Sequence, residues 1–112
     1  MKGTYLGELE EIVLLTIAAL YDKAYGVAIV EEIATRTGRQ LSFGAMYTVL
    51  MRLEEKGYVN SREGDATKSR GGRRKKLYTL TTGGEQALRV AREIRVSLWQ
   101  SIPQAAFPSN IA

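Results

Sequence analysis

Apolar residues recur along the chain with helical spacing in four segments, and the first two precede residue 40. Residues 7–21 are apolar on more than one side, so this helix is expected to lie centrally in a core or to be shared with a second chain. Residues 27–37 carry an apolar stripe centred on Ile29 and Ile33, with charged residues opposite. Gly38 follows as a helix stop signal. Two amphipathic helices therefore open the chain.

A third, shorter helix is predicted between Ser42 and Gly57. The Ser42 hydroxyl can accept a backbone N–H that has no partner inside the first turn, and Gly57 can end the helix in the left-handed conformation. Met46, Leu50 and Leu53 form one apolar stripe. The remaining faces of this helix are therefore available to contact a partner.

Two short strands are predicted after this helix, over residues 58–63 and 75–81. Both segments combine β-branched, aromatic and apolar side chains, as half-buried hairpin strands do. The loop between them has no apolar side chain larger than that of Ala66. The pattern indicates a β-hairpin with a charged, solvated tip.

The longest predicted helix starts after Leu80 and runs to about Ile102, roughly 30 Å. Thr82, with Glu85 three residues on, is a capping-box candidate, and Thr81 is the alternative N-cap. Such a helix is too long to be covered by a hairpin and three short helices, so we infer that its outer half packs against a copy of itself. Pro103 is expected to end it. Residues 104–112 show no periodicity, which predicts a loosely ordered tail.

The order of these elements predicts a mainly α protein with a small β-hairpin. Short helices joined by a tight turn and followed by a hairpin form a winged helix-turn-helix. We expect residues 1–81 to form this winged-helix domain. Residues 82–112 are expected to supply the C-terminal dimerisation helix and tail, and the two parts should make one compact unit.

Positive charge is concentrated in the hairpin. Residues 62–76 contain seven Lys and Arg side chains against two carboxylates, a net charge of +5, whereas the whole chain carries only +4. The rest of the chain is therefore close to neutral, at −1. A cationic loop beside a helix with a polar contact face indicates nucleic-acid binding rather than general basicity.

The residues expected to contact DNA lie on the third helix and on the hairpin, which would serve as the wing. Tyr47 has two interpretations, a core aromatic or a contact to the DNA backbone. Arg52 alone on the helix offers the donor fork that suits guanine, although it could instead reach a phosphate or a nearby Glu. The helix candidates are Ser42, Gly44, Ala45, Tyr47, Thr48 and Arg52, and the wing candidates are Lys68, Arg70, Gly71, Gly72, Arg73, Arg74 and Lys75.

The long helix and the first helix supply candidates for a dimer interface or an effector pocket. Trp99, the single tryptophan, is either an interface anchor or one wall of a flat apolar pocket for an aromatic ligand. The candidates are Leu9, Val13, Leu88, Ala91, Arg95, Leu98, Trp99 and Ile102.

The composition argues against several functional classes. Without His or Cys the chain lacks the commonest general base, the commonest metal ligand and any thiolate site. We therefore expect no enzyme, no catalytic residues, no metal and no cofactor. No stretch resembles a signal peptide or a membrane span, so a cytoplasmic protein is expected. RNA in place of duplex DNA, and a winged-helix module for protein–protein contact, stay open as alternatives.

Several segments, taken in order, resemble the PadR family of bacterial winged-helix transcriptional regulators. The resemblance covers about residues 6–88 and is specific through the order and spacing of its segments. They are Leu6-Gly-Glu-Leu-Glu10, Tyr25-Gly-Val27, Ser42-Phe-Gly-Ala-Met-Tyr47, Leu50-Met-Arg-Leu-Glu-Glu-Lys-Gly57, Gly71-Gly-Arg-Arg-Lys75, and Tyr78-Thr-Leu-Thr81 followed by Gly84.

The resemblance implies a homodimeric repressor whose third helix enters the major groove of an inverted-repeat operator, while the wing grips the flanking backbone. A small, aromatic effector or another signal would release the DNA. The single C-terminal helix resembles the short-tailed branch, in which this helix serves dimerisation, and some relatives use a tryptophan there to bind planar drugs. Thr48 departs from the proline frequent in the family, and residues 65–69 are extra in the wing tip.

Overall fold

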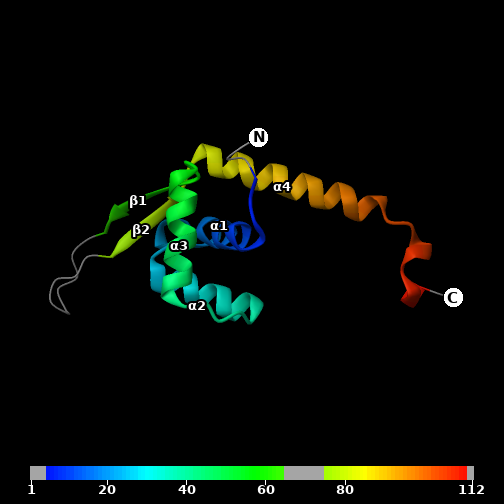
Figure 1. The fold of residues 1–112 in the computed structure, drawn as a ribbon, viewed down its shortest axis with the longest axis horizontal. Helices are drawn as coiled ribbons and strands as arrows, with labels where there is room; N and C mark the ends of the chain where they lie inside the picture. The colour runs from blue at the N-terminus through cyan, green and yellow to red at the C-terminus, as the bar shows by residue number, and fades with distance from the viewer. Residues whose placement is uncertain (1–4, 65–74, 111–112) are drawn as a thin grey trace.

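A computed structural model describes residues 5–64 and 75–110 of the chain, and its architecture is a winged helix-turn-helix followed by one long helix (Figure 1). Three helices form the body, a two-stranded antiparallel hairpin projects from it at one end, and the long helix leaves it at the other. The elements are α1 (Glu8–Leu20), η1 (Tyr21–Lys23), α2 (Gly26–Thr37), α3 (Phe43–Glu55), β1 (Val59–Glu63), β2 (Lys76–Leu80), α4 (Thr82–Ser101), η3 (Gln104–Ala106) and η4 (Pro108–Asn110).

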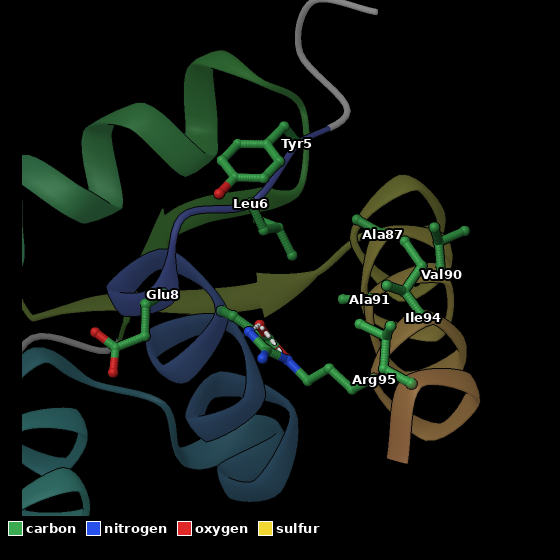
Figure 2. A pocket seen from close by; sticks show the side chains of 10 residues that line it. Tyr5, Leu6, Glu8, Ala87, Val90, Ala91, Ile94 and Arg95 are labelled. Carbon is green, nitrogen blue, oxygen red and sulfur yellow. Dashed lines mark hydrogen bonds and ion pairs between the residues drawn. The ribbon is translucent and has the colours of Figure 1, made fainter. Parts of the chain in front are cut away.

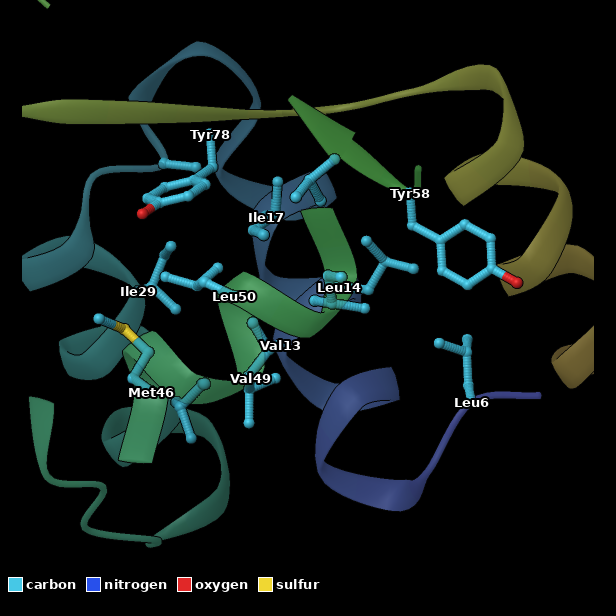
Figure 3. Packing of buried hydrophobic residues seen from close by; sticks show 14 residues of the cluster. Leu6, Val13, Leu14, Ile17, Ile29, Met46, Val49, Leu50, Tyr58 and Tyr78 are labelled. Atoms are coloured by element: carbon cyan, nitrogen blue, oxygen red, sulfur yellow. The ribbon is translucent and has the colours of Figure 1, made fainter. Parts of the chain in front are cut away.

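The core lies between α1, α2 and α3, and the hairpin closes one side of it (Figure 3). The sequence pattern predicts its members well, because the stripes on all three helices point inward. α1 is central, as its many apolar faces suggest, and packs against both other helices. The fully buried side chains at the centre include Val13, Leu14, Ile17, Ile29, Ile33, Met46, Leu50, Leu53 and Val59.

The ends of the helices are fixed by local hydrogen bonds. The Ser42 hydroxyl accepts the N–H of Ala45 at 3.0 Å and caps α3. Gly38 and Gly57 both adopt the left-handed conformation, with φ of 77° and 79°. These residues act as the sequence predicts, because no other residue enters that conformation as freely.

The start of α4 decides between the two N-caps that the sequence predicts. Thr81, not Thr82, is the N-cap, and its hydroxyl accepts the N–H of Gly84 at 3.0 Å. The same hydroxyl donates to the carbonyl of Gly57 at 2.7 Å, so this cap also ties α4 to the turn after α3. Thr82 is the first helical residue. The tertiary hydrogen bond to Gly57 decides between two caps that look equivalent in the sequence.

The hairpin pairs residues 59–63 with residues 76–80 in antiparallel register, from Val59 opposite Leu80 to Glu63 opposite Lys76. It is anchored to the body where the N–H of Tyr78 donates to the carbonyl of Ala24 at 3.0 Å. The wing tip lies outside the described residues, and with it six of the predicted wing contacts: Lys68, Arg70, Gly71, Gly72, Arg73 and Arg74.

The long helix makes the molecule elongated. Its radius of gyration is 17.2 Å, whereas a compact chain of this length has about 13 Å. The first turns of α4 pack on the body through Gly84, Ala87 and Leu88, but every residue from 92 to 101 is exposed. No helix among residues 5–64 and 75–110 is long and apolar enough to cross a membrane.

The segment after α4 differs from the expected loose tail. It forms two 3-10 turns, η3 and η4, and the Phe107 ring lies beside the Trp99 ring with centroids 6.2 Å apart. Pro103 and Pro108, which precede or open these turns, hold their φ angles near helical values. Sequence periodicity does not detect turns as short as these.

Candidate nucleic-acid interface

The surface of α3 divides into an inner, buried apolar face and an outer, exposed face that mixes polar residues with Phe43, Tyr47 and Met51. The stripe of Met46, Leu50 and Leu53 is fully buried, as its spacing predicts. All six helix residues predicted to contact DNA are exposed: Ser42, Gly44, Ala45, Tyr47, Thr48 and Arg52. The structure thus brings these residues together on one accessible helix, although their contacts with DNA remain a prediction.

Tyr47 is a surface residue, which decides against its interpretation as a core aromatic. Its side chain is 47% exposed, and its ring stacks on that of Phe43 with centroids 6.5 Å apart. Its hydroxyl reaches the first residue of α2, where a Cβ atom on Gly26 would lie only 2.8 Å from it. The absence of a side chain on Gly26 therefore leaves room for the Tyr47 hydroxyl at the start of α2. Phe43 is a second surface aromatic on α3, and the sequence analysis did not predict it.

Arg52 and Thr48 lie on the exposed side of the same helix. The Thr48 hydroxyl donates to the carbonyl of Gly44 at 3.0 Å, so it is partly satisfied within the helix. Within the described ranges Arg52 forms no ion pair, so pairing with a neighbouring glutamate does not occupy it. Its guanidinium keeps its donor fork for a base edge or a phosphate.

The described part of the wing is its base. Lys75, the one predicted wing residue that the structure describes, is exposed, and its ammonium lies 5.9 Å from the centre of the Tyr25 ring. This is within the range of a cation–π contact. Arg62 and Lys76 are exposed nearby on the two strands. The cationic charge of the loop therefore begins at the point where the hairpin leaves the body.

The candidates for a dimer interface or effector pocket fall into two groups. Leu98, Trp99 and Ile102 are exposed on the outer half of α4, with Leu98 at 62% and Trp99 at 67%. Leu9, Leu88 and Ala91 are partly buried near its inner half. Val13 contradicts its assignment, since it is fully buried in the core of one chain and presents no surface to a partner. Leu9 and Val13 are four residues apart and so lie on the same face of α1, one turn from each other, and the helical pattern does not say which of the two is fully covered.

Two shallow apolar grooves flank α4 where Arg95 crosses to Glu11. The first has a volume of about 280 Å³ and lies between Tyr5 and Leu6 on one side and α4 on the other (Figure 2). The second, about 270 Å³, includes Leu15, Leu88, Val96 and Trp99. In the part of the chain that the structure describes, no group of three or more carboxylates forms a candidate metal site.

Comparisons with known proteins agree with this architecture. The sequence matches the Transcriptional regulator PadR-like family over residues 14–90, which is more than half of the chain. The structure resembles a PadR family transcription regulator from Clostridium difficile R20291, with 29% identity, a TM-score of 0.68, and coverage of 86% of this chain and 98% of that one. No curated protein matches the sequence.

Two further structures extend the comparison. A padr family transcriptional regulator from Eggerthella lenta DSM 2243 is 27% identical, with a TM-score of 0.65 over 83% of this chain and 80% of that one. A complex structure of hsRosR-SG is 24% identical, with a TM-score of 0.74 over 91% of this chain and 83% of that one, and it supports the fold alone.

Proposed function

This chain belongs to the PadR-like family of transcriptional regulators, and on that premise we propose that it is a homodimeric repressor released from its operator by a small aromatic effector. The family and its solved structures support a DNA-binding regulator and not an enzyme. The observation that carries the DNA-binding part of the proposal is the accessible face of α3 beside the cationic base of the wing. We place its activity in the cytoplasm.

In this proposal α3 lies in the major groove. Its outer face combines small residues, which let the helix approach the bases, with Arg52, whose fork can bond guanine bidentately. Tyr47 is positioned at the edge of that face, where its hydroxyl can donate to a phosphate. The capped first turn of α3 adds free backbone N–H groups at the DNA surface.

The wing contributes affinity without reading sequence. Arg73 and Arg74, flanked by Gly71 and Gly72, would neutralise phosphates of the flanking backbone. Changing both arginines to alanine should weaken binding to all duplexes alike and flatten the salt dependence by roughly one unit per lost phosphate contact. A selective loss at one base pair would contradict this role. Lys23→Ala, at an exposed cation after α1, removes one positive charge and controls for the net charge of either single variant, Arg73→Ala or Arg74→Ala.

A second copy would cover the outer half of α4. Exposed apolar side chains follow one another along it, among them Ile94, Leu98 and Trp99. Patches of this kind are rare on monomers and mark interfaces. A two-fold dimer would present two α3 helices to half-sites roughly 34–36 Å apart, so the operator should be an inverted repeat.

The effector would bind beside Trp99. The groove there includes Leu15, Leu88, Val96 and the ring of Trp99. Its other lining residues are charged, namely Glu11, Arg89, Arg92 and Arg95, but the surface that they present to the groove is mostly apolar, which suits a planar aromatic molecule. An aromatic effector should quench Trp99 fluorescence and lower DNA affinity together. Quenching without any change in DNA affinity would make Trp99 an interface anchor only.

The experiment that tests the proposal is selection of bound duplexes from a random pool at stated salt, with and without candidate aromatic molecules. We expect enrichment of an inverted repeat that weakens when the effector is present. Enrichment of no duplex would favour a winged-helix module for protein–protein contact, and enrichment without symmetry would contradict the dimer.

A further inference from the structure

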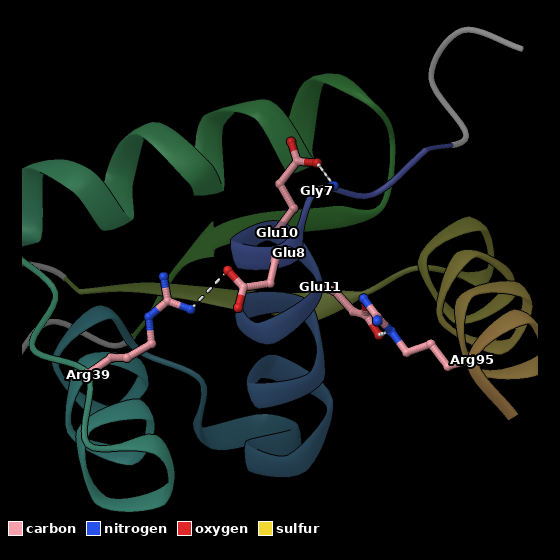
Figure 4. Close-up of polar contacts among 6 residues, drawn as sticks. All are labelled: Gly7, Glu8, Glu10, Glu11, Arg39 and Arg95. Atoms are coloured by element: carbon pink, nitrogen blue, oxygen red, sulfur yellow. Dashed lines mark hydrogen bonds and ion pairs between the residues drawn. The ribbon is translucent and has the colours of Figure 1, made fainter. Parts of the chain in front are cut away.

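The carboxylates in the first turn of α1 bind cations from three other parts of the protein. Figure 4 shows two of these pairs, Glu8 with Arg39 and Glu11 with Arg95. Each of three glutamates pairs with a cation that comes from a different segment. The segments are the connection between α2 and α3, the residue that ends α3, and the middle of α4. The pairs are Glu8 with Arg39 at 3.1 Å, Glu10 with Lys56 at 2.9 Å, and Glu11 with Arg95 at 2.6 Å.

The three pairs differ in burial and therefore in strength. The Glu10 and Glu11 side chains are only 11% and 13% exposed, whereas that of Glu8 is 70% exposed. Exposed pairs contribute little because water and salt screen them. The Glu10–Lys56 pair is shielded on both sides, because the Lys56 side chain is 24% exposed. In the pair to α4 only the Glu11 carboxylate is shielded, since the Arg95 side chain is 59% exposed, so this contact fixes geometry through its two donor nitrogens and not through burial.

The contact to α3 is part of a small network. Glu10 accepts the ammonium of Lys56 and also the N–H of Gly7, the latter at 2.8 Å. Lys56 donates in addition to the carbonyl of Tyr5 at 2.9 Å. The end of α3 is thus tied both to α1 and to the segment before it, which lines the first groove beside α4.

The contact to α4 is the more informative one, because little else holds that part of the helix. Among the described residues, Arg95 is the only member of 92–101 that is hydrogen bonded to the body. Both Nε and Nη2 of Arg95 donate to the Glu11 carboxylate. Because the guanidinium is planar and donates through two nitrogens, it fixes the orientation of Arg95 relative to Glu11 as well as their distance. A lysine ammonium, which makes a single contact, does not fix orientation.

We propose that Arg95 is a positioning residue that determines the spacing of half-sites the protein accepts. It does so by fixing the angle at which α4 leaves the body through Glu11. This inference rests on the proposed dimer through α4. Since Glu10 and Lys56 hold α3 to the same turn of α1, the angle of α4 fixes where each recognition helix lies relative to the two-fold axis.

The length of α4 makes the spacing sensitive to this angle. A helix of 20 residues is about 30 Å long. A rotation of about 10° at one end moves the other by about 5 Å, which exceeds the 3.4 Å rise of one base pair. Loss of the Arg95 contact should therefore relax the preferred spacing by roughly one to two base pairs on that scale.

The distance between the two DNA-reading units can be measured directly, because the chain contains no cysteine. A spin label on Thr35→Cys, at an exposed position of α2, reports the separation between protomers. We expect a narrow distance distribution in the labelled parent and a broad or displaced one in Arg95→Met and in Glu11→Gln. Arg92→Met, one turn earlier on α4 and exposed, removes the same charge and should keep the parent distribution.

A second measurement connects the geometry with DNA. The ratio of affinities for the preferred operator and for one lengthened by two base pairs should fall roughly twofold to fivefold in Arg95→Met, the range expected for an ion pair whose cation is exposed. Affinity for an isolated half-site should not change, and the urea midpoint of the monomer should fall no further in Arg95→Met than in Glu11→Gln. A merely structural role would lower the half-site affinity as well.

The outcomes separate this inference from the function it rests on. A narrow, unchanged distribution and an unchanged spacing ratio in Arg95→Met would overturn the positioning role while leaving the dimer intact. If no spin–spin distance between protomers is detected in the labelled parent, the proposed dimer is overturned, and the positioning role with it. Equal broadening in Arg92→Met would assign the effect to net charge and would also overturn it.

Discussion

The body of the molecule and its long helix differ in how far their apolar side chains are buried. In the body, the apolar stripes of α1, α2 and α3 cover one another, and the central side chains are completely buried within one chain. In α4, only the first turns pack on the body, and Ile94, Leu98 and Trp99 stay exposed. The central apolar residues of the body are therefore covered within one chain, whereas those on the outer half of α4 are not, as the proposed dimer would require.

The junction between these two regions is unusually tight. Gly84, in the first turn of α4, is the one buried residue of that helix. A Cβ atom there would overlap the carbonyl of Tyr58 and come within 2.8 Å of Leu80 Cδ1. Backbone meets backbone at this point, so the body dictates where α4 starts, and Arg95 dictates where it points.

The largest expected effect is at this junction. Gly84→Ala should destabilise the fold by at least about 4 kcal/mol, because the added methyl group meets backbone that cannot move aside. Gly83→Ala is the matched control: its Cβ would sit 3.4 Å from the nearest atom, so it should be close to neutral. Urea unfolding followed by circular dichroism measures both. Similar midpoints for the two variants would show that α4 is not fixed at its start.

The next largest effect is the difference in stability between a leucine-to-alanine substitution in the body and the same substitution on α4. Leu50→Ala, in the body, should cost about 3 kcal/mol through the cavity it leaves. Leu98→Ala, on α4, should change the unfolding free energy of the monomer by less than about 0.5 kcal/mol. It should instead weaken the dimer, which dilution series would detect. Equal losses of monomer stability at both sites would remove the distinction between body and helix.

A smaller effect comes from the ion pair that joins α1 to the end of α3. Burial raises the pKa of the Glu10 carboxyl. The hydrogen bonds from Lys56 and Gly7 and the charges of Lys56 and Arg52 lower the pKa by more than burial raises it, so the net pKa lies below the ordinary value of 4.5. A carboxyl whose pKa is depressed by folding stabilises the protein above its unfolded pKa, and this contribution is lost as pH falls through the folded pKa. Glu10→Gln should therefore cost roughly 1–2 kcal/mol at neutral pH.

The pH dependence tests the cause of that loss. The difference in unfolding free energy between the parent and Glu10→Gln should shrink as the pH is lowered from neutral to about 3, since the parent carboxylate becomes protonated. Glu55→Gln, at the exposed last residue of α3, removes one negative charge as well and serves as the control. A difference that stays constant with pH would assign the loss to packing.

A substitution in the body with a small effect on stability is expected next to the outer surface of α3. Gly26→Ala places a methyl group 2.8 Å from the Tyr47 hydroxyl, and the half-exposed ring can swing away at a cost below about 1 kcal/mol. DNA affinity should fall roughly threefold to tenfold, the value of one hydrogen bond. Tyr47→Phe should produce the same loss. If Tyr47→Phe binds DNA like the parent, Tyr47 makes no phosphate contact.

Most of the fold is predictable from local pattern. The buried stripes, the Ser42 cap, the left-handed glycines and the hairpin all follow from residue type and spacing, and the resemblance to the PadR family is confirmed by the comparisons. These features depend on neighbours within a few residues, where propensity and periodicity are informative.

The features that the sequence did not reveal depend on distant contacts. Thr81 was preferred over Thr82 as a cap because it also reaches Gly57, and Val13 lies in the core because of how α1 is rotated against α2 and α3. The bond between Arg95 and Glu11 joins residues 84 positions apart, and no spacing rule predicts such a pair. The candidate interface on α3 was readable in advance, whereas its connection to α4 was not.

In the proposed function, two copies of the chain dimerise through the exposed half of α4 and place one α3 helix in each half-site of the operator. Sedimentation equilibrium of the protein on the duplex recovered by selection tests it most directly. We predict two chains per duplex for the parent, and a single weakly bound chain for Leu98→Asp, whose new charge cannot be buried between two helices. One chain per duplex for the parent, with the same affinity as Leu98→Asp, would contradict the account.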